Sequence, residues 1–106
     1  MKLVIRRAAL AELNSIHDYI SKANPFAAKS VVQRILKSIE RLGSFPLSGH
    51  AGAVSGTREL NVPRLPYIVV YVVADGQIDV TAIFHAAQDR PRGFSEDDEL
   101  TTISAL

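Results

Sequence analysis

The chain has 106 residues, enough for one domain with a core of its own and too few for a second. It contains no cysteine, which excludes disulfides and thiolate metal sites, and three scattered histidines do not suit a structural zinc site. No apolar run approaches the roughly 20 residues that span a bilayer, and no signal-peptide core is present. We therefore expect a cytoplasmic protein without membrane contact, metal or other cofactor.

The net charge of +1 hides an uneven distribution along the chain. All twelve Lys and Arg residues precede position 93, whereas residues 96–99 (EDDE) supply four of the eleven acids. Residues 1–95 therefore carry a net charge of +5. Such a surface suits nucleic acid or an acidic partner segment, but it is also common in proteins that bind neither.

The N-terminal half predicts one strand and two helices. Alternation over Lys2 to Arg6 indicates a short strand. From Ala8 to about Lys22 the apolar residues recur at helical spacing, with Glu12, Ser15 and Asp18 turned away from the core. Asn24 as N-cap and Pro25 at the first helical position start a second helix that ends at Leu42, before Gly43. So short a connection predicts an antiparallel helical hairpin.

The second helix carries Lys29, Arg34, Lys37 and Arg41 on its outer face. These cations have two interpretations: an ordinary solvated helix surface, or a surface that attracts an anionic partner electrostatically.

Gly43 to Gly56 forms an irregular loop that contains four glycines and one proline but no Lys, Arg, Asp or Glu. A loop of this length in a small domain is often functional or mobile. We expect Phe45 and Leu47 to fix its first half to the core. Residues 57–62 (TRELNV) then alternate as a strand, and Pro63 and Pro66 rigidify the following turn.

The strongest local signal is a β-hairpin from Tyr67 to His85. Two runs rich in β-branched and aromatic residues flank Asp75-Gly76, the pair typical of a two-residue turn. Counting outward from this turn fixes a register in which Ala74 lies opposite Gln77.

That register divides the hairpin into two faces. The apolar face, which we expect to pack against the helices, comprises Tyr67, Val69, Tyr71, Val73, Ile78, Val80, Ala82 and Phe84. The mixed face, the better candidate for a partner, comprises Ile68, Val70, Val72, Asp79, Thr81, Ile83 and His85.

The element order predicts an α+β domain over residues 1–94. It comprises an N-terminal strand, an antiparallel αα-hairpin and a three-stranded antiparallel meander, with the helices packed on one face of the sheet. The first strand is expected to join beside a later one, which makes the sheet mixed or wholly antiparallel. Residues 95–106 form an acidic C-terminal tail, predicted as a short helix or a frayed end.

The order of these features resembles the RelE/ParE superfamily of type II toxin–antitoxin toxins, and in particular its ParE-like branch. The resemblance covers about residues 1–92. It rests on the Asn-Pro junction between the helices, Phe45-Pro46 before the glycine-rich loop, residues 56–59 (GTRE), the Tyr-x-x-x-Tyr spacing from Tyr67 and the closing residues 83–85 (IFH). The resemblance implies a bacterial toxin held inactive by an antitoxin encoded beside it.

The superfamily divides into two mechanisms. ParE-like members poison DNA gyrase and have no recognised nuclease residues, whereas RelE-like members cleave mRNA on the ribosome. Metal-free RNA cleavage needs a base, an acid and cations around the phosphorane. The uncharged loop and Ala86, where several nucleases carry Tyr, favour the ParE-like mechanism, so no catalytic residues are assigned.

The alternative is an mRNA interferase that uses Arg58, Arg64 and His85. His85 at a strand end suits general acid–base catalysis, but it can equally hydrogen-bond the chain where it leaves the sheet. Tyr67 and Tyr71 fit core packing better than catalysis. A third reading is a toxin fold that only forms complexes and does not arrest growth.

All three readings predict an antitoxin partner. The resemblance implies a ParD-like, DNA-binding dimer whose acidic or amphipathic C-terminal segment wraps the toxin in a hetero-oligomer. We do not expect the toxin itself to bind a specific DNA sequence. The predicted antitoxin- or target-binding residues are Arg58, Ile68, Val70, Ile83, His85 and Arg90.

Overall fold

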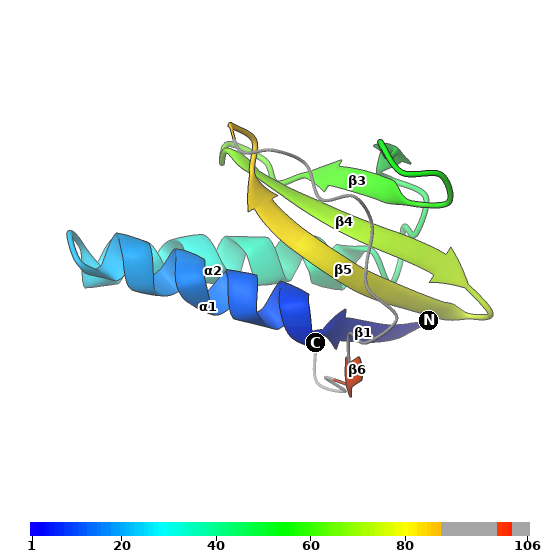
Figure 1. Cartoon of the computed structure of the whole chain (residues 1–106), viewed down its shortest axis with the longest axis horizontal. Helices are drawn as coiled ribbons and strands as arrows, with labels where there is room; N and C mark the ends of the chain where they lie inside the picture. Colours follow the sequence, from blue (N-terminus) through cyan, green and yellow to red (C-terminus); the bar gives the residue numbers. More distant parts are fainter. Residues whose placement is uncertain (88–99, 103–106) are drawn as a thin grey trace.

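The computed structural model describes residues 1–87 and 100–102 (Figure 1). In chain order its elements are β1 (Lys2–Arg6), α1 (Arg7–Ser21), α2 (Pro25–Arg41), β2 (His50–Ala51), β3 (Arg58–Asn61), β4 (Tyr67–Ala74), β5 (Gln77–His85) and β6 (Leu100–Thr102). This arrangement confirms the predicted α+β fold. Neither helix in the described residues is long and apolar enough to cross a membrane.

The helical hairpin forms where the sequence predicts it. Asn24 caps α2, because its side-chain Oδ1 accepts a hydrogen bond from the N–H of Ala27 at 3.1 Å. Pro25 occupies the first turn, where its missing N–H costs no hydrogen bond. The tight connection makes α1 and α2 neighbours along their length (Figure 1).

The sheet is mixed, with the strand order β2-β3-β4-β5-β1-β6. β3, β4 and β5 form the predicted antiparallel meander, and β1 pairs with β5 in parallel. The backbone of Leu100–Thr102 pairs antiparallel with β1, which differs from the helix or frayed end expected of the tail. The expected helix start at residues 95–99 lies outside the described residues.

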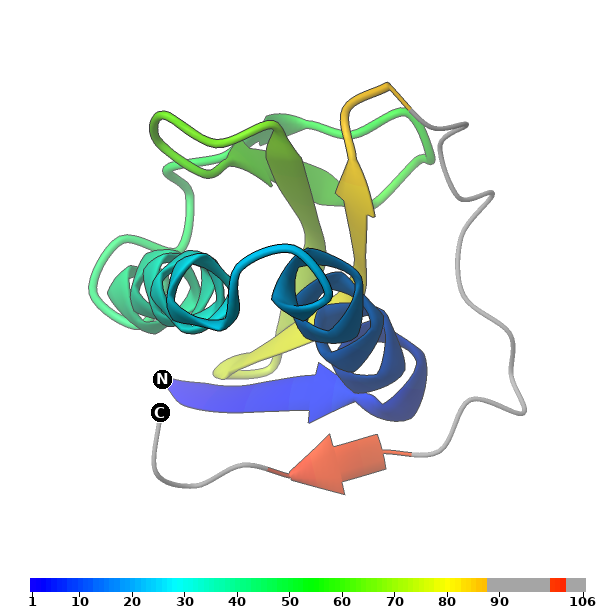
Figure 2. The same ribbon diagram turned by 90° about the vertical axis from the view of Figure 1, so that its left-hand side faces the viewer.

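Both helices cover the same face of the sheet, as Figure 2 shows. The core between the two layers takes Leu13 from α1, Ile35 and Ile39 from α2, and Tyr71 and Val69 from β4, none of them more than 4% exposed. Tyr67 also belongs to this core, which confirms that both tyrosines face the helices.

One extra residue in β5 changes the predicted register. The pairing follows the count from Ala74↔Gln77 to Tyr71↔Val80, but the next pair is Val70↔Ala82. Thr81 is therefore a β-bulge, and its hydroxyl donates to the carbonyl of Val70 at 3.4 Å. A single extra residue moves every later side chain of the strand to the opposite face.

The predicted faces are therefore wrong beyond Thr81. Ile83, expected on the mixed face, is 1% exposed and packs in the core beneath the helices. Ala82 and Phe84, expected beneath the helices, instead form a cluster with Ile68 and Val70 on the other face. The assignments of Ile68 and Val70 hold, but both are only 6% exposed.

Candidate functional site

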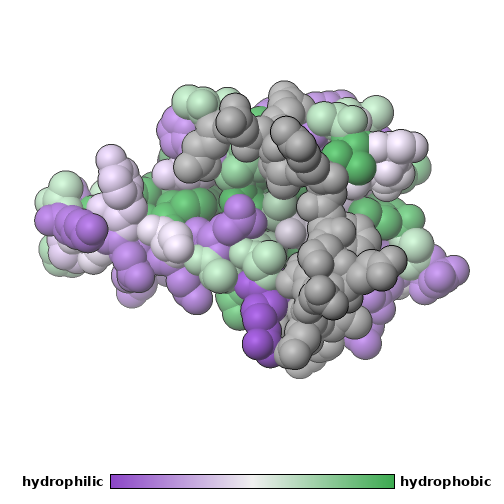
Figure 3. Space-filling model, viewed as in Figure 1, coloured by the Kyte–Doolittle hydropathy of each residue, from purple (hydrophilic) through white to green (hydrophobic). Residues whose placement is uncertain are grey.

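A groove of about 730 Å³ runs between α1 and the last residues of β5. It is lined by Ala11, Glu12, Ser15, Ile16 and Tyr19 from α1 and by Tyr67, Ile83, Phe84 and His85 from the hairpin. In the space-filling view, apolar residues lie between α1 and the upper strands, and hydrophilic residues border them on the helix side (Figure 3). A second hollow, of about 140 Å³, lies between α2 and β3 and is much smaller than the groove.

The groove exists because β1 is shorter than β5. Their parallel pairing ends at Ile5↔Val80, and the chain then turns into α1. Beyond Val80, the outer edge of β5 therefore faces a helix instead of a strand. A strand edge without a neighbour leaves backbone N–H and C=O groups that need other partners.

Glu12 supplies one of these partners. Its Oε1 accepts a hydrogen bond from the backbone N–H of Ile83 at 3.1 Å. Glu12 was predicted on the outward side of α1, and this prediction is wrong, since the side chain is half-buried against β5. A carboxylate in this position stabilises the strand edge and also occupies the place that an added strand would take.

Tyr67 and His85 form the end of the groove. Their ring centroids are 5.4 Å apart and the rings meet edge to face at 85°. Burial raises the pKa of the Tyr67 phenol, and the nearby phenol of Tyr19 raises it further. Tyr19 itself is 76% exposed at the rim. The groove thus presents aromatic surface together with hydrogen-bonding groups, a combination typical of protein-binding sites.

The Nδ1 atom of His85 accepts a hydrogen bond from the N–H of Ala87 at 3.0 Å. This contact matches the reading in which His85 bonds the chain where it leaves the sheet. The backbone is also held there by the N–H of Ala86, which donates to the carbonyl of Pro66 at 2.8 Å. His85 therefore fixes the exit of β5 at the end of the groove.

The other predicted site residues are scattered. Arg58 pairs with Tyr71 and His85 with Tyr67, so they lie four residues apart along β4, or about 13 Å. Arg64 is exposed in the turn before β4, and Arg90 lies outside the described residues. No group of three metal-ligating side chains occurs among the described residues.

Arg58 is bound to the glycine-rich loop. Its Nη2 donates to the carbonyls of Leu47 and Gly49, at 3.0 and 2.6 Å. Tyr71 holds the same segment, because its hydroxyl donates to the carbonyl of Pro46 and accepts from the N–H of Gly49, both at 2.9 Å. The loop is therefore fixed by polar contacts from β3 and β4.

This polar attachment corrects a prediction about the loop. Phe45 and Leu47 were expected to fix it to the core, but they are 59% and 66% exposed. Further along, the carboxylate of Glu59, which is 2% exposed, accepts from the N–H of Ala53 at 3.0 Å. The loop has no Lys, Arg, Asp or Glu of its own, and the charged side chains of Arg58 and Glu59 form hydrogen bonds with its backbone.

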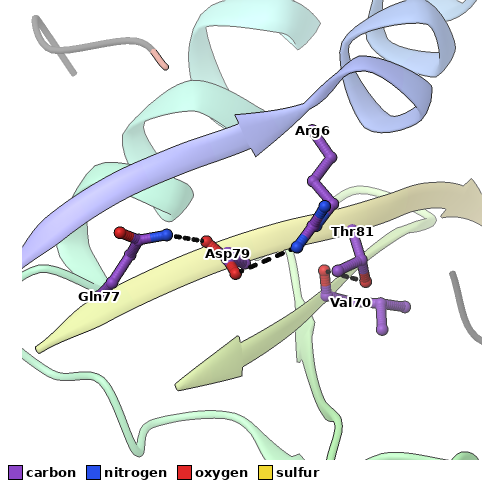
Figure 4. Close-up of polar contacts among 5 residues, drawn as sticks. All are labelled: Arg6, Val70, Gln77, Asp79 and Thr81. Atoms are coloured by element: carbon purple, nitrogen blue, oxygen red, sulfur yellow. Dashed lines mark hydrogen bonds and ion pairs between the residues drawn. The ribbon is translucent and has the colours of Figure 1, made fainter. Parts of the chain in front are cut away.

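A polar cluster lies where β1 ends beside β5 (Figure 4). Arg6 Nη2 lies 3.4 Å from Asp79 Oδ2, and the Gln77 amide donates to the other oxygen of the same carboxylate. Asp79 is thus engaged from both sides and fixes the end of β1. The cluster has a structural explanation and adds no group to the groove.

Glu12, Ser15 and Tyr19 of α1 and Phe84 of β5 are among the groove residues that were not predicted as partner contacts. The three on α1 belong to its polar or exposed side, where the pattern indicates solvent. Phe84 was assigned to the core by the register that the bulge changes.

Comparison with known proteins places the chain among toxins. Residues 3–90 match the family described as the ParE toxin of the type II toxin–antitoxin system parDE. The chain is 37% identical over 84 residues to the putative toxin Y4kP of Sinorhizobium fredii, which covers 79% of this chain and 86% of that protein. It is 39% identical over 80 residues to toxin RelE2 of Caulobacter vibrioides, at 76% and 89% coverage.

The fold comparison agrees with the sequence comparison. A chain of the chromosomal ParDE system from P. aeruginosa superposes with a TM-score of 0.73 and 28% sequence identity. The match covers 80% of this chain and 95% of that one.

Proposed function

Because the chain belongs to the ParE toxin family of type II toxin–antitoxin systems, we propose that it arrests growth by binding DNA gyrase and that a cognate ParD-like antitoxin neutralises it. The superfamily includes two mechanisms, gyrase binding and mRNA cleavage. The names of the relatives do not distinguish these mechanisms, since they include both a RelE2 toxin and a ParDE system.

The hydrogen bonds of Arg58 are the main support for a mechanism based on protein binding. A nuclease arginine must direct its guanidinium at the reacting phosphate. Arg58 instead donates to two carbonyls of the loop, at 3.0 and 2.6 Å. His85 lies on β5, on the other side of β4, offset from Arg58 by four residues or about 13 Å along the strands, and its Nδ1 accepts a hydrogen bond from Ala87. These residues support the scaffold and do not converge on one substrate.

The groove between α1 and β5 is the proposed antitoxin site. Its aromatic walls suit one face of an amphipathic helix, the mode in which a partly disordered segment commonly docks on a domain. Strand addition is disfavoured at this point because Glu12 occupies the N–H of Ile83. His85 is the proposed contact at the end of the groove, beside Tyr67. An acidic antitoxin segment would complement the basic body of the toxin.

Ile68 and Val70 remain proposed partner contacts on the opposite face. Their low exposure limits them to a supporting role, since a partner can reach only a small part of either side chain. Ile83 is withdrawn as an outward contact because it packs in the core.

A supercoiling assay with purified gyrase tests the proposal. We expect the toxin to reduce supercoiling of relaxed plasmid or to accumulate cleaved DNA, and the added antitoxin to restore activity. Unchanged supercoiling at high toxin excess would overturn the gyrase assignment. A parallel translation reaction with ribosomes and mRNA separates the mechanisms, since transcripts cut within codons would identify an interferase.

Expression without the antitoxin provides the remaining control. A toxin of either mechanism arrests growth, whereas a fold retained only for complex formation does not. Normal growth together with intact antitoxin binding would therefore reject both toxin mechanisms. The protein would then act only by forming a complex with the antitoxin.

A further inference from the structure

The outer face of α2 carries a regular row of polar and basic side chains. Lys29, Gln33, Lys37 and Arg41 follow one another at intervals of four residues, so they lie along one side of the helix. All four are exposed. From Lys29 to Arg41 the row extends over about 18 Å. We call this row, together with the adjacent Ser30, the α2 basic row.

The cations of the α2 basic row are not neutralised by the described protein. No ion pair joins Lys29, Lys37 or Arg41 to a carboxylate in the described residues. By contrast, Arg6 is paired with Asp79 beside β5. Glu40 is the single acidic residue of α2. The row therefore presents an excess of positive charge to an external partner.

The side chains between the cations indicate the chemistry of that partner. Ser30 and Gln33 offer a hydroxyl and an amide, which donate hydrogen bonds to phosphate oxygens. The row contains no apolar side chain on which an acidic amphipathic helix could pack. It also has no series of aromatic rings on which the bases of a single strand could stack, since Phe26 at one end is alone.

We propose that the α2 basic row binds the phosphate backbone of duplex DNA without reading its sequence. A row of cations on a straight helix fits a duplex, which carries one negative charge per about 1.7 Å of its axis. This contact is independent of the gyrase assignment, because it requires only the exposed cations of α2. If the target of the toxin itself holds DNA, the contact between the α2 basic row and that DNA would increase the affinity of the toxin for the target.

Fluorescence anisotropy with a short labelled duplex of arbitrary sequence tests the proposal. We expect a dissociation constant of about 10⁻⁴ to 10⁻⁶ M near physiological salt, and tighter binding at about 50 mM salt. The triple variant Lys29→Gln, Lys37→Gln and Arg41→Gln should reduce the slope of log affinity against log salt by about 2 to 3. All three positions are exposed, so circular dichroism and thermal unfolding should remain those of the parent.

A matched control removes the same charge elsewhere. Lys2→Gln, Arg7→Gln and Lys22→Gln are also exposed and lie outside α2. We expect this variant to change the slope by less than about 1. Equal losses in the two variants would overturn the proposal, because the attraction would then come from overall charge. Absence of duplex binding at low salt, or tighter binding of a single strand or a polyglutamate peptide than of the duplex, would overturn it as well.

Discussion

Glu12 of α1 and Ile83 of β5 are joined by a hydrogen bond from the Ile83 backbone N–H to the Glu12 carboxylate, 3.1 Å long. This bond connects the helical hairpin to the part of β5 that β1 does not reach. Both residues line the groove, so the residue that stabilises the strand edge also belongs to the proposed antitoxin site.

Replacing Glu12 should therefore cost stability. Glu12→Ala leaves the half-buried N–H of Ile83 without its acceptor, and we expect a loss of about 1–3 kcal/mol in the free energy of unfolding, measured with urea. Glu12→Gln keeps an acceptor oxygen and should lose less. Asn14→Ala, at an exposed position of the same helix, should stay within about 0.5 kcal/mol of the parent. Equal stability of the Glu12→Ala and Asn14→Ala variants would contradict this role.

Tyr67 predicts how stability depends on alkaline pH. Burial, and secondarily Tyr19, raises the pKa of the Tyr67 phenol in the folded protein. Below the unfolded-state pKa of about 10, the phenol is neutral in both states and this stabilisation is complete. As the pH rises through that value and on towards the folded pKa, the unfolded state loses its proton first, so stability falls.

Urea unfolding between pH 8 and about pH 11 measures this effect. We expect Tyr67→Phe to show a shallower decline than the parent. Tyr19→Phe should reduce the decline by less, because Tyr19 is the smaller of the two causes. A Tyr67→Phe variant with the same pH dependence as the parent would show that the phenol does not titrate differently in the two states.

Arg58 is predicted to act on stability. Arg58→Ala removes two hydrogen bonds to the carbonyls of Leu47 and Gly49, and charged donors of this kind contribute about 1.5–3 kcal/mol. Limited proteolysis should then cut the loop from Gly43 to Gly56 faster. Arg64→Ala, at an exposed turn, should leave proteolysis unchanged. Full stability combined with lost toxicity in the Arg58 variant would instead indicate a direct contact with the target.

The helices and strands could be predicted because their signals are local. Asn24-Pro25, Asp75-Gly76 and the apolar periodicities each specify a neighbouring turn or face, and the observed boundaries of both helices lie within one residue of those predicted. The pairing of β1 with β5 in parallel is a tertiary feature, and the sequence left its partner open.

The bulge at Thr81 could not be predicted because both registers satisfy the pattern. Residues 82–84 (AIF) are all apolar, so shifting them by one position still places an apolar side chain on each face. No glycine marks the position. The groove could not be predicted for the same reason, since the shifted register places His85 beside Tyr67 and moves Phe84 to the face of Ile68. The contact of Glu12 could not be predicted, because the N–H of Ile83 is available to it only where β1 ends beside β5.

A substitution at an exposed position of the groove should weaken antitoxin binding without lowering the stability of the toxin. Ser15 is exposed and lines the groove, so Ser15→Arg should fill it with a long charged side chain while α1 stays folded. Asn14 is also exposed but does not line the groove, which makes Asn14→Arg a control with the same added charge on the next residue of α1. If the antitoxin docks between α1 and β5, Ser15→Arg should weaken the complex by at least about tenfold, or about 1.4 kcal/mol, in calorimetric titration. Asn14→Arg should bind as the parent does. Both variants add one positive charge, so any effect of charge alone should be the same in both. Equal antitoxin affinities of the two variants would therefore place the antitoxin elsewhere on the toxin, even if both differ from the parent.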